Sequence, residues 1–70
     1  MEMQPVESSN IQSIGYDPAQ SVMHVAFKSG GVYAYHNVAP HQHQALMSAQ
    51  SVGGHLSRVL KPTIKKILKV

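Results

Sequence analysis

The stretch MHVAFKSGGVYAYH, residues 23–36, decides the fold of this chain. On both sides of a glycine-rich centre, large apolar residues alternate with other residues, and this period of two predicts a β-hairpin. A three-residue loop over 29–31 would pair Phe27 with Tyr33 and Val25 with Tyr35. One face of the hairpin would then point to the core and carry Met23, Val25, Phe27, Tyr33 and Tyr35. The other face would carry His24, Lys28 and His36.

The residues before this hairpin predict a third strand. It would run from Asn10 to Tyr16, with Ile11 and Ile14 as its apolar members. Pro18 then favours a turn, because its ring fixes its own φ angle and keeps the preceding residue out of a helix. Residues 1–8 are mostly polar and predict a loose lead-in.

The residues after the hairpin predict helices. Pro40 suits the first position of a helix over residues 41–50, since proline is favoured there. Ser51 is expected to cap a second helix, which Pro62 would end or bend. The last segment predicts a short basic helical turn with an apolar stripe made of Ile64, Ile67 and Leu68.

This order of elements predicts an α+β fold. We expect a three-stranded antiparallel β-meander, then two short helices packed on one face, and a basic C-terminal helical turn. The chain would divide into a lead-in at 1–8, a domain at 9–61 and a basic amphipathic tail at 62–70. The 70 residues include no cysteine, and a chain of this size buries only a thin core. We therefore expect self-association, with the stripe of the last segment as its contact.

The charges are distributed unevenly along the chain. All three acidic residues lie in the first seventeen positions, and five of the six Lys and Arg residues lie in the last thirteen. These five are Arg58, Lys61, Lys65, Lys66 and Lys69. A basic end attracts polyanions such as nucleic acid, so we expect these residues to contact phosphates. The alternative is a solvated face whose apolar side packs on a neighbour.

Several residues at characteristic spacing resemble a known family. They are Pro5-Val6, Ser8 to Ile11, Ile14 to Asp17, Phe27, Gly30, Tyr33 to Tyr35, Val38, Pro40, Leu46, Ala49, Ser51 and Gly53. The string is similar to the KTSC domain, named for a C-terminal segment of some lysyl-tRNA synthetases and also found free-standing in bacteria and phages. The resemblance implies RNA binding, with Tyr33 and Tyr35 as its central motif. The chain departs from the family at His55, Leu56 and Ser57, where an aromatic pair and Asn are usual.

Tyr33 and Tyr35 have two possible roles. They would stack on bases if their face were exposed, as aromatic side chains do on RNA-binding sheets. The hairpin pattern instead places both on the face that the helices cover, so we predict that they are core residues. Tyr33→Ala would then cost about 3–5 kcal/mol.

Other chemistry is not expected. The five histidines do not have the grouping with acids that a zinc site needs, so we predict no metal and no cofactor. Neither a nucleophile motif nor a carboxylate pair is present, so we predict no enzyme and no catalytic residue. The sequence also lacks a long apolar run and a signal peptide, which favours a soluble cytoplasmic protein without a membrane partner.

These observations favour a small binding module that engages an anionic partner, with RNA as the first candidate. The alternative is a homo-oligomeric protein-interaction module. That module would be a phage-encoded modulator of a host protein or a binder of a small nucleotide. The salt dependence of binding would distinguish RNA binding from a protein interface. Polyanion binding weakens steeply with salt, whereas an apolar interface hardly changes.

Overall fold

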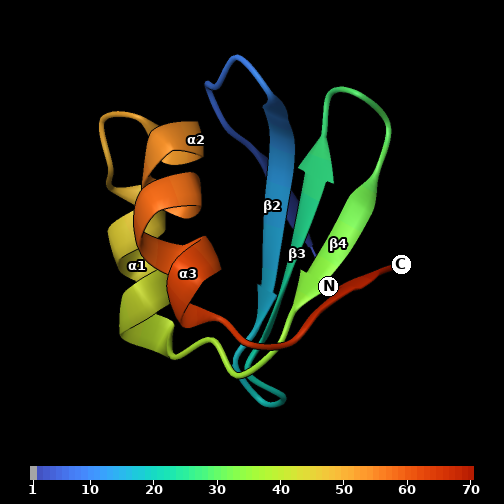
Figure 1. Ribbon diagram of the computed structural model, residues 1–70, viewed down its shortest axis with the longest axis vertical. Coiled ribbons are helices and arrows are strands. Elements are labelled where there is room, and N and C mark those ends of the chain that lie inside the picture. The colour runs from blue at the N-terminus through green and yellow to red at the C-terminus, as the bar shows by residue number, and fades with distance from the viewer. Residues whose placement is uncertain (1) are drawn as a thin grey trace.

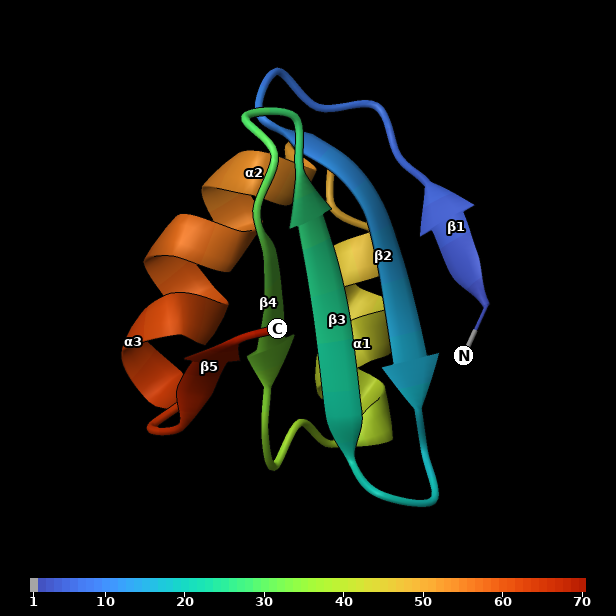
Figure 2. The ribbon, with the colours of Figure 1, turned by 90° about the vertical axis from the view of Figure 1, so that its right-hand side faces the viewer.

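The computed structural model describes residues 2–70 as two layers, a five-stranded antiparallel sheet with helices on one face (Figure 1). The strands are β1 (Met3–Pro5), β2 (Ile11–Asp17), β3 (Val22–Phe27), β4 (Val32–Tyr35) and β5 (Ile67–Lys69). They lie in sequence order, so β1 and β5 are the two edges of the sheet (Figure 2). The α+β class and the meander are confirmed, but the predicted number of three strands is wrong.

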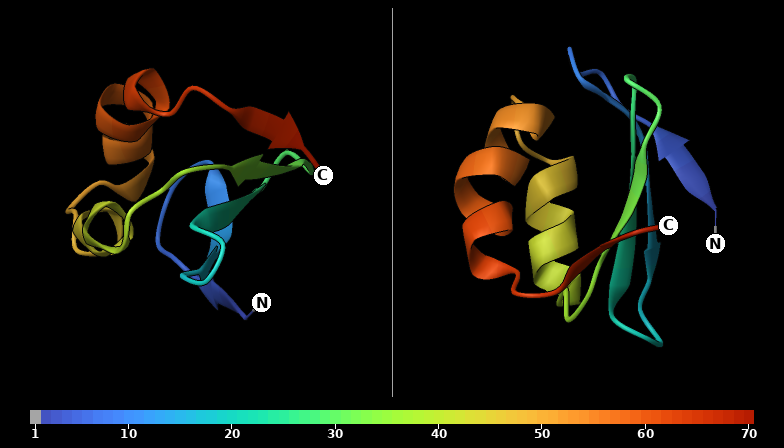
Figure 3. Two further views of the ribbon diagram at one scale, coloured as in Figure 1. Left: turned by 90° about the horizontal axis from the view of Figure 1, so that it is seen from below. Right: turned by 45° about the vertical axis from the view of Figure 1, so that its right-hand side comes forward.

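The helical layer consists of two helical stretches. The first is α1 (Pro40–Met47), and the second comprises α2 (Val52–His55), the π-helical segment η1 (Leu56–Leu60) and α3 (Lys61–Thr63). Both stretches lie on the same side of the sheet (Figure 3). The prediction of two helices on one face is confirmed.

Local signals start both stretches. Pro40 occupies the first turn of α1, and the side chain of Gln42 accepts a hydrogen bond of 2.8 Å from the Ala39 N–H. Ser51 caps α2, since its hydroxyl oxygen accepts a hydrogen bond of 3.2 Å from the Gly54 N–H. Each bond satisfies an N–H group at the helix start that has no partner within the helix.

We expect Ser51→Ala to lower the free energy of unfolding by about 0.5–2 kcal/mol, the usual cost of losing an N-cap. Urea denaturation followed by circular dichroism would measure this change. Ser51→Asp is the control, because aspartate retains an acceptor at the cap and should preserve most of the stability. Equal stability of the alanine variant and the parent would contradict the cap.

Pro62 neither stops the second stretch at once nor leaves it regular. The Lys61 N–H bonds to the Leu56 carbonyl, one residue further back than in an α-helix, and α3 then ends at Thr63. A proline ring crowds the carbonyl four residues before it, and a wider π turn is one way for a helix to relieve that clash. The chain leaves the helix at Ile64, whose backbone is extended.

The hairpin of β3 and β4 has the predicted faces but a different register. Val25 pairs with Tyr33, and Met23 pairs with Tyr35. The Phe27 N–H bonds to the Gly31 carbonyl at 2.8 Å, so the loop spans residues 28–30 rather than 29–31. Each partner is displaced by two positions from the prediction. A displacement of two leaves every side chain on its original face.

A β-bulge in β2 places both of its isoleucines in the core. Ile11 and Ile14 are three positions apart, and regular alternation would put them on opposite faces. The pairing with β3 shifts between Ile11 and Ser13, and both isoleucines are almost fully buried. The extra residue of the bulge corrects the phase of the strand.

The core lies between the sheet and the helices. Its buried members are Ile11, Ile14, Met23, Val25, Tyr35, Val38, Leu46, Val52, Leu56, Leu60 and Ile64. Phe27 and Tyr33 are partly buried and pack against this cluster. Val59, in the π-helical segment η1, is 49% exposed.

Two predictions about the chain ends are wrong. Met3–Pro5 forms β1 against β2 instead of a loose lead-in, and Ile67–Lys69 forms β5 against β4 instead of a helical turn. The pairing of the last strand extends to a bond from the His36 N–H to the Lys66 carbonyl and one from the Val70 N–H to the Val32 carbonyl. A helix of this length has little stability alone, whereas the edge of β4 offers partners for its backbone.

The predicted contact stripe does not form one surface. Ile64 is 7% exposed and belongs to the core, whereas Leu68 is 49% exposed. Ile67 and Leu68 are neighbours in β5, and neighbouring side chains of a strand point to opposite faces. Within residues 2–70, no helix has the length and apolar character needed to cross a membrane.

Candidate nucleic-acid interface

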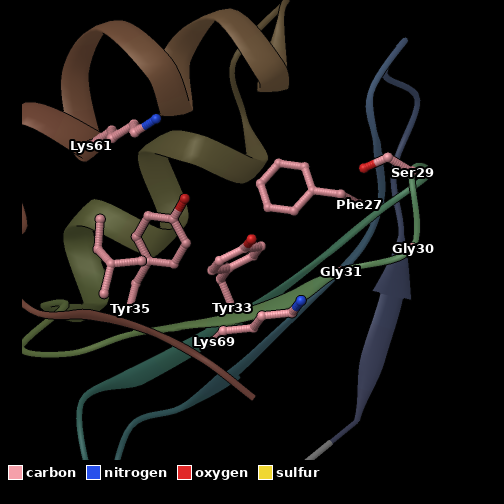
Figure 4. A pocket seen from close by; sticks show the side chains of 9 residues that line it. Phe27, Ser29, Gly30, Gly31, Tyr33, Tyr35, Lys61 and Lys69 are labelled. Carbon is pink, nitrogen blue, oxygen red and sulfur yellow. The ribbon is translucent and has the colours of Figure 1, made fainter.

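An open hollow of about 590 Å³ lies where the β3–β4 hairpin, β5 and α3 meet (Figure 4). Three aromatic side chains from the two hairpin strands line it, Phe27, Tyr33 and Tyr35. Two lysines border it from other elements, Lys61 from α3 and Lys69 from β5. Ile67, the loop residues Ser29 and Gly30, and Gly31 directly after the loop complete the lining. Aromatic rings and cationic groups thus share one recess.

The two tyrosines of β4 differ in exposure. Tyr35 is only 3% exposed and belongs to the core cluster, while Tyr33 is half-buried at the wall of the hollow. The ring of Phe27 meets that of Tyr33 edge to face, with centroids 5.7 Å apart and planes at 78°. Burial, and to a lesser degree the neighbouring Tyr33, raises the pKa of Tyr35. A phenol hydroxyl can both donate and accept a hydrogen bond.

Gly30, in the hairpin loop, and Gly31, directly after it, favour glycine for different structural reasons. Gly30 has a φ angle of 112°, a backbone conformation that residues with a side chain rarely adopt. Gly31 lies against the ring of Tyr33, where a Cβ atom would be 3.0 Å from Tyr33 Cε1. The small size of Gly31 therefore leaves room for the Tyr33 ring in its observed position.

The structure brings together two of the five basic residues that the sequence singled out. Lys61 and Lys69 border the hollow, whereas Lys65 lines a separate small recess beside His36 and Asn37. The alternation of the last strand puts Lys66 on the face opposite Lys69. Arg58 turns back along its helix, and its Nε donates to the Gly54 carbonyl at 3.3 Å.

The charge separation along the chain becomes a separation across the sheet. Glu2 precedes β1, Glu7 follows it, and Asp17 ends the neighbouring β2. The lysines of the hollow lie on the side of β4 and β5, at the opposite edge. An anion approaching the hollow therefore meets positive charge without a nearby carboxylate from these residues.

A second hollow, of about 550 Å³, has a different character. It is polar and lies where the segment before β2 meets the start of α2, with Ser8, Asn10, Ser51 and Gly53 among its lining. Its polar groups largely bond one another: the Ser8 hydroxyl donates to Asn10 Oδ1 at 2.9 Å, and Ser51 caps α2. The first bond lies within the segment before β2 and the second within the start of α2.

The histidines have separate surroundings. Within residues 2–70, no three side chains among His, Asp and Glu come close enough together to hold a metal ion. His43 stacks on Tyr16 with ring centroids 4.6 Å apart, and burial lowers the pKa of His43. The Tyr16 hydroxyl donates to the Val38 carbonyl, so this pair links β2 to the start of the helical layer.

The sequence pattern did not indicate that Phe27 and the hairpin loop would line a hollow. Phe27 was assigned to the core, and the loop only to a turn. The signal in the sequence was the second glycine, since a loop that needs one positive φ angle does not need two glycines. The meeting of Lys61 with Lys69 had no sequence signal, because their elements meet only in the folded chain.

The family model of the KTSC domain matches residues 7–63. This chain belongs to the KTSC domain family. An uncharacterised protein of Stutzerimonas stutzeri is 44% identical over 62 residues, which cover 89% of this chain and 87% of that protein. A protein of Tsukamurella paurometabola is 38% identical over 65 residues, covering 93% of this chain and 97% of the relative.

A crystal structure of a KTSC domain protein from Yersinia pestis has the same fold. Its TM-score is 0.93 at 39% sequence identity, and the match covers 99% of this chain and 96% of that one. The family model ends at Thr63, before β5. The structural match continues through nearly the whole chain, so the segment with Ile67 and Lys69 is part of a shared KTSC architecture rather than an appendage.

Proposed function

We propose that this KTSC protein is a small non-enzymatic module that binds RNA at the hollow between the β3–β4 hairpin, β5 and α3. The observation that carries the proposal is the meeting of Lys61 and Lys69, from two separate elements, at a recess lined by Phe27 and Tyr33. Proteins that bind single-stranded nucleic acid combine positive charge for the phosphates with aromatic rings for the bases.

The basic residues outside the hollow would also contribute to binding. Lys61 and Lys69 would contact phosphates nearest the hollow, while Lys65, Lys66 and Arg58 would add long-range attraction around it. The contact is with phosphates and ring faces, which every RNA sequence offers. Binding should therefore be strongly dependent on salt and only weakly dependent on sequence.

A direct test uses fluorescence anisotropy with a labelled single-stranded RNA and the full chain at several salt concentrations. We expect binding at low salt and a logarithmic slope of about −0.7 for each phosphate contact, the value for single strands. A matched fluorescent label without RNA is the control. Failure to bind RNA at low salt would contradict the proposal.

The second candidate function is self-association through the helix-free face of the sheet. Leu68 is 49% exposed and Val70 is 69% exposed at that edge, and apolar side chains of this kind favour an interface. A second copy of the chain is the proposed occupant. Light scattering should then show a concentration-dependent dimer that Leu68→Gln weakens, and a monomer at millimolar concentration would contradict it.

A further inference from the structure

We infer that the hollow holds a single unpaired nucleobase with its phosphate between Lys61 and Lys69. This chemistry is shared by single-stranded RNA and by free nucleotides. The inference rests on the proposed function and narrows it, because it names the part of the RNA that enters the recess and excludes a base that remains in a duplex.

The shape of the hollow favours one base. Its volume of about 590 Å³ lies within the range of about 300–1,000 Å³ typical of small-ligand sites. The hairpin loop bounds one end and α3 the other, so the rings of Phe27 and Tyr33 lie within a recess and not on an open platform (Figure 4). A base in an A-form duplex stays in its stack and cannot reach rings that are recessed in this way.

The aromatic pair offers a ring face to such a base. Because Phe27 and Tyr33 meet edge to face, the pair presents surfaces in two orientations at the wall of the hollow. Gly31 keeps this arrangement open, since a side chain at that position would press on the Tyr33 ring. The residue directly after the hairpin loop therefore helps to set the position of the Tyr33 ring.

The polar groups around the rings suit a nucleotide and not an apolar ligand. Figure 4 shows Lys61 above the rings and Lys69 below them, with the hydroxyl of Tyr35 directed toward Lys61. The ammonium groups of Lys61 and Lys69, on two sides of the recess, can bind the phosphates of an RNA strand that passes over it. Phenol hydroxyls both donate and accept hydrogen bonds, so they tolerate any of the four bases.

The test is photo-crosslinking of 5-bromouridine, with the cross-linked residue located by mass spectrometry. The full chain is mixed with a single-stranded oligouridylate carrying one 5-bromouridine, with the same strand in a duplex, and with free 5-bromouridine monophosphate. We expect cross-links to Phe27 or Tyr33 with the single strand. We also expect affinity for the duplex to be lower by about tenfold, equivalent to one lost base stack.

Substitutions in the recess make the test specific. Tyr33→Leu retains apolar volume but removes the ring, and it should weaken single-strand binding about tenfold. Tyr16→Leu is the matched control, because Tyr16 stacks on His43 away from the hollow. Circular dichroism would check folding, and if Tyr33→Leu does not fold, Gly31→Ala tests the same recess by displacing the ring.

The outcomes separate the inference from the proposed function. If RNA binds but cross-links lie only outside the hollow, or the duplex binds as tightly, the inference is wrong and RNA binding stands. If only the free nucleotide cross-links to Phe27 or Tyr33, the base site is supported and the RNA function fails. If no probe binds, both are overturned.

Discussion

Tyr35→Ala should unfold most of the protein at room temperature. Tyr35 is 3% exposed within the core cluster, and removing a large buried aromatic side chain typically costs about 3–5 kcal/mol. A domain of this size without a disulfide rarely has more than about 3–5 kcal/mol to lose. The measurement is the urea midpoint followed by far-ultraviolet circular dichroism.

Two variants test whether this cost comes from burial. Tyr35→Phe keeps the ring and should retain most of the stability. Tyr33→Ala should cost less than Tyr35→Ala, because Tyr33 is half-buried at the wall of the hollow. The sequence pattern predicts the full core penalty for Tyr33, but burial places the larger penalty at Tyr35, two residues further along the same strand. A folded Tyr35→Ala protein with unchanged stability would contradict this assignment.

The double variant Lys61→Gln and Lys69→Gln should lose most of the RNA affinity that depends on the hollow. Both lysines border the recess, and loss of two phosphate contacts should flatten the logarithmic salt slope by about 1.4 in total for single strands. We expect affinity to fall by about tenfold at low salt. Anisotropy titrations over a range of salt concentrations would measure both quantities.

The chain offers a matched control for this experiment. Lys65→Gln and Lys66→Gln remove the same charge from the same region, but Lys65 lines another recess. Strand alternation places Lys66 on the face opposite Lys69. Glutamine has nearly the helix propensity of lysine, so the substitution at Lys61 should leave its helix intact. Equal losses in the two double variants would mean that only net charge matters and that the hollow is not the site.

Much of the fold was predictable because its signals are local. The alternation in residues 23–36 places Met23 and Val25 on the helix-facing side of the sheet. That assignment survived an incorrect register, since a displacement of two positions preserves the faces. Pro40 and Ser51 start the two helical stretches as expected, because a cap requires only a few neighbouring residues.

The candidate site was predictable only in part. The basic C-terminal region and the tyrosine motif were both visible in the sequence, but nothing in the chain order linked them. Lys61 and Lys69 reach the same recess because β5 returns along β4 after α3 ends. The sequence does not reveal this return. From sequence alone, the five basic residues therefore form one set and Phe27 is predicted only as a core residue.

By itself, the sequence determined the hairpin faces, the helix starts and the separation of acidic from basic residues. The tertiary structure alone decided that Ile67–Lys69 is a strand, that β1 completes the other edge and that Tyr33 borders a hollow while Tyr35 is buried. The physical reason is that a short segment has almost no conformational preference of its own. Its backbone N–H and C=O groups hydrogen-bond to the strand edge that the folded domain leaves unpaired, which here is the edge of β4.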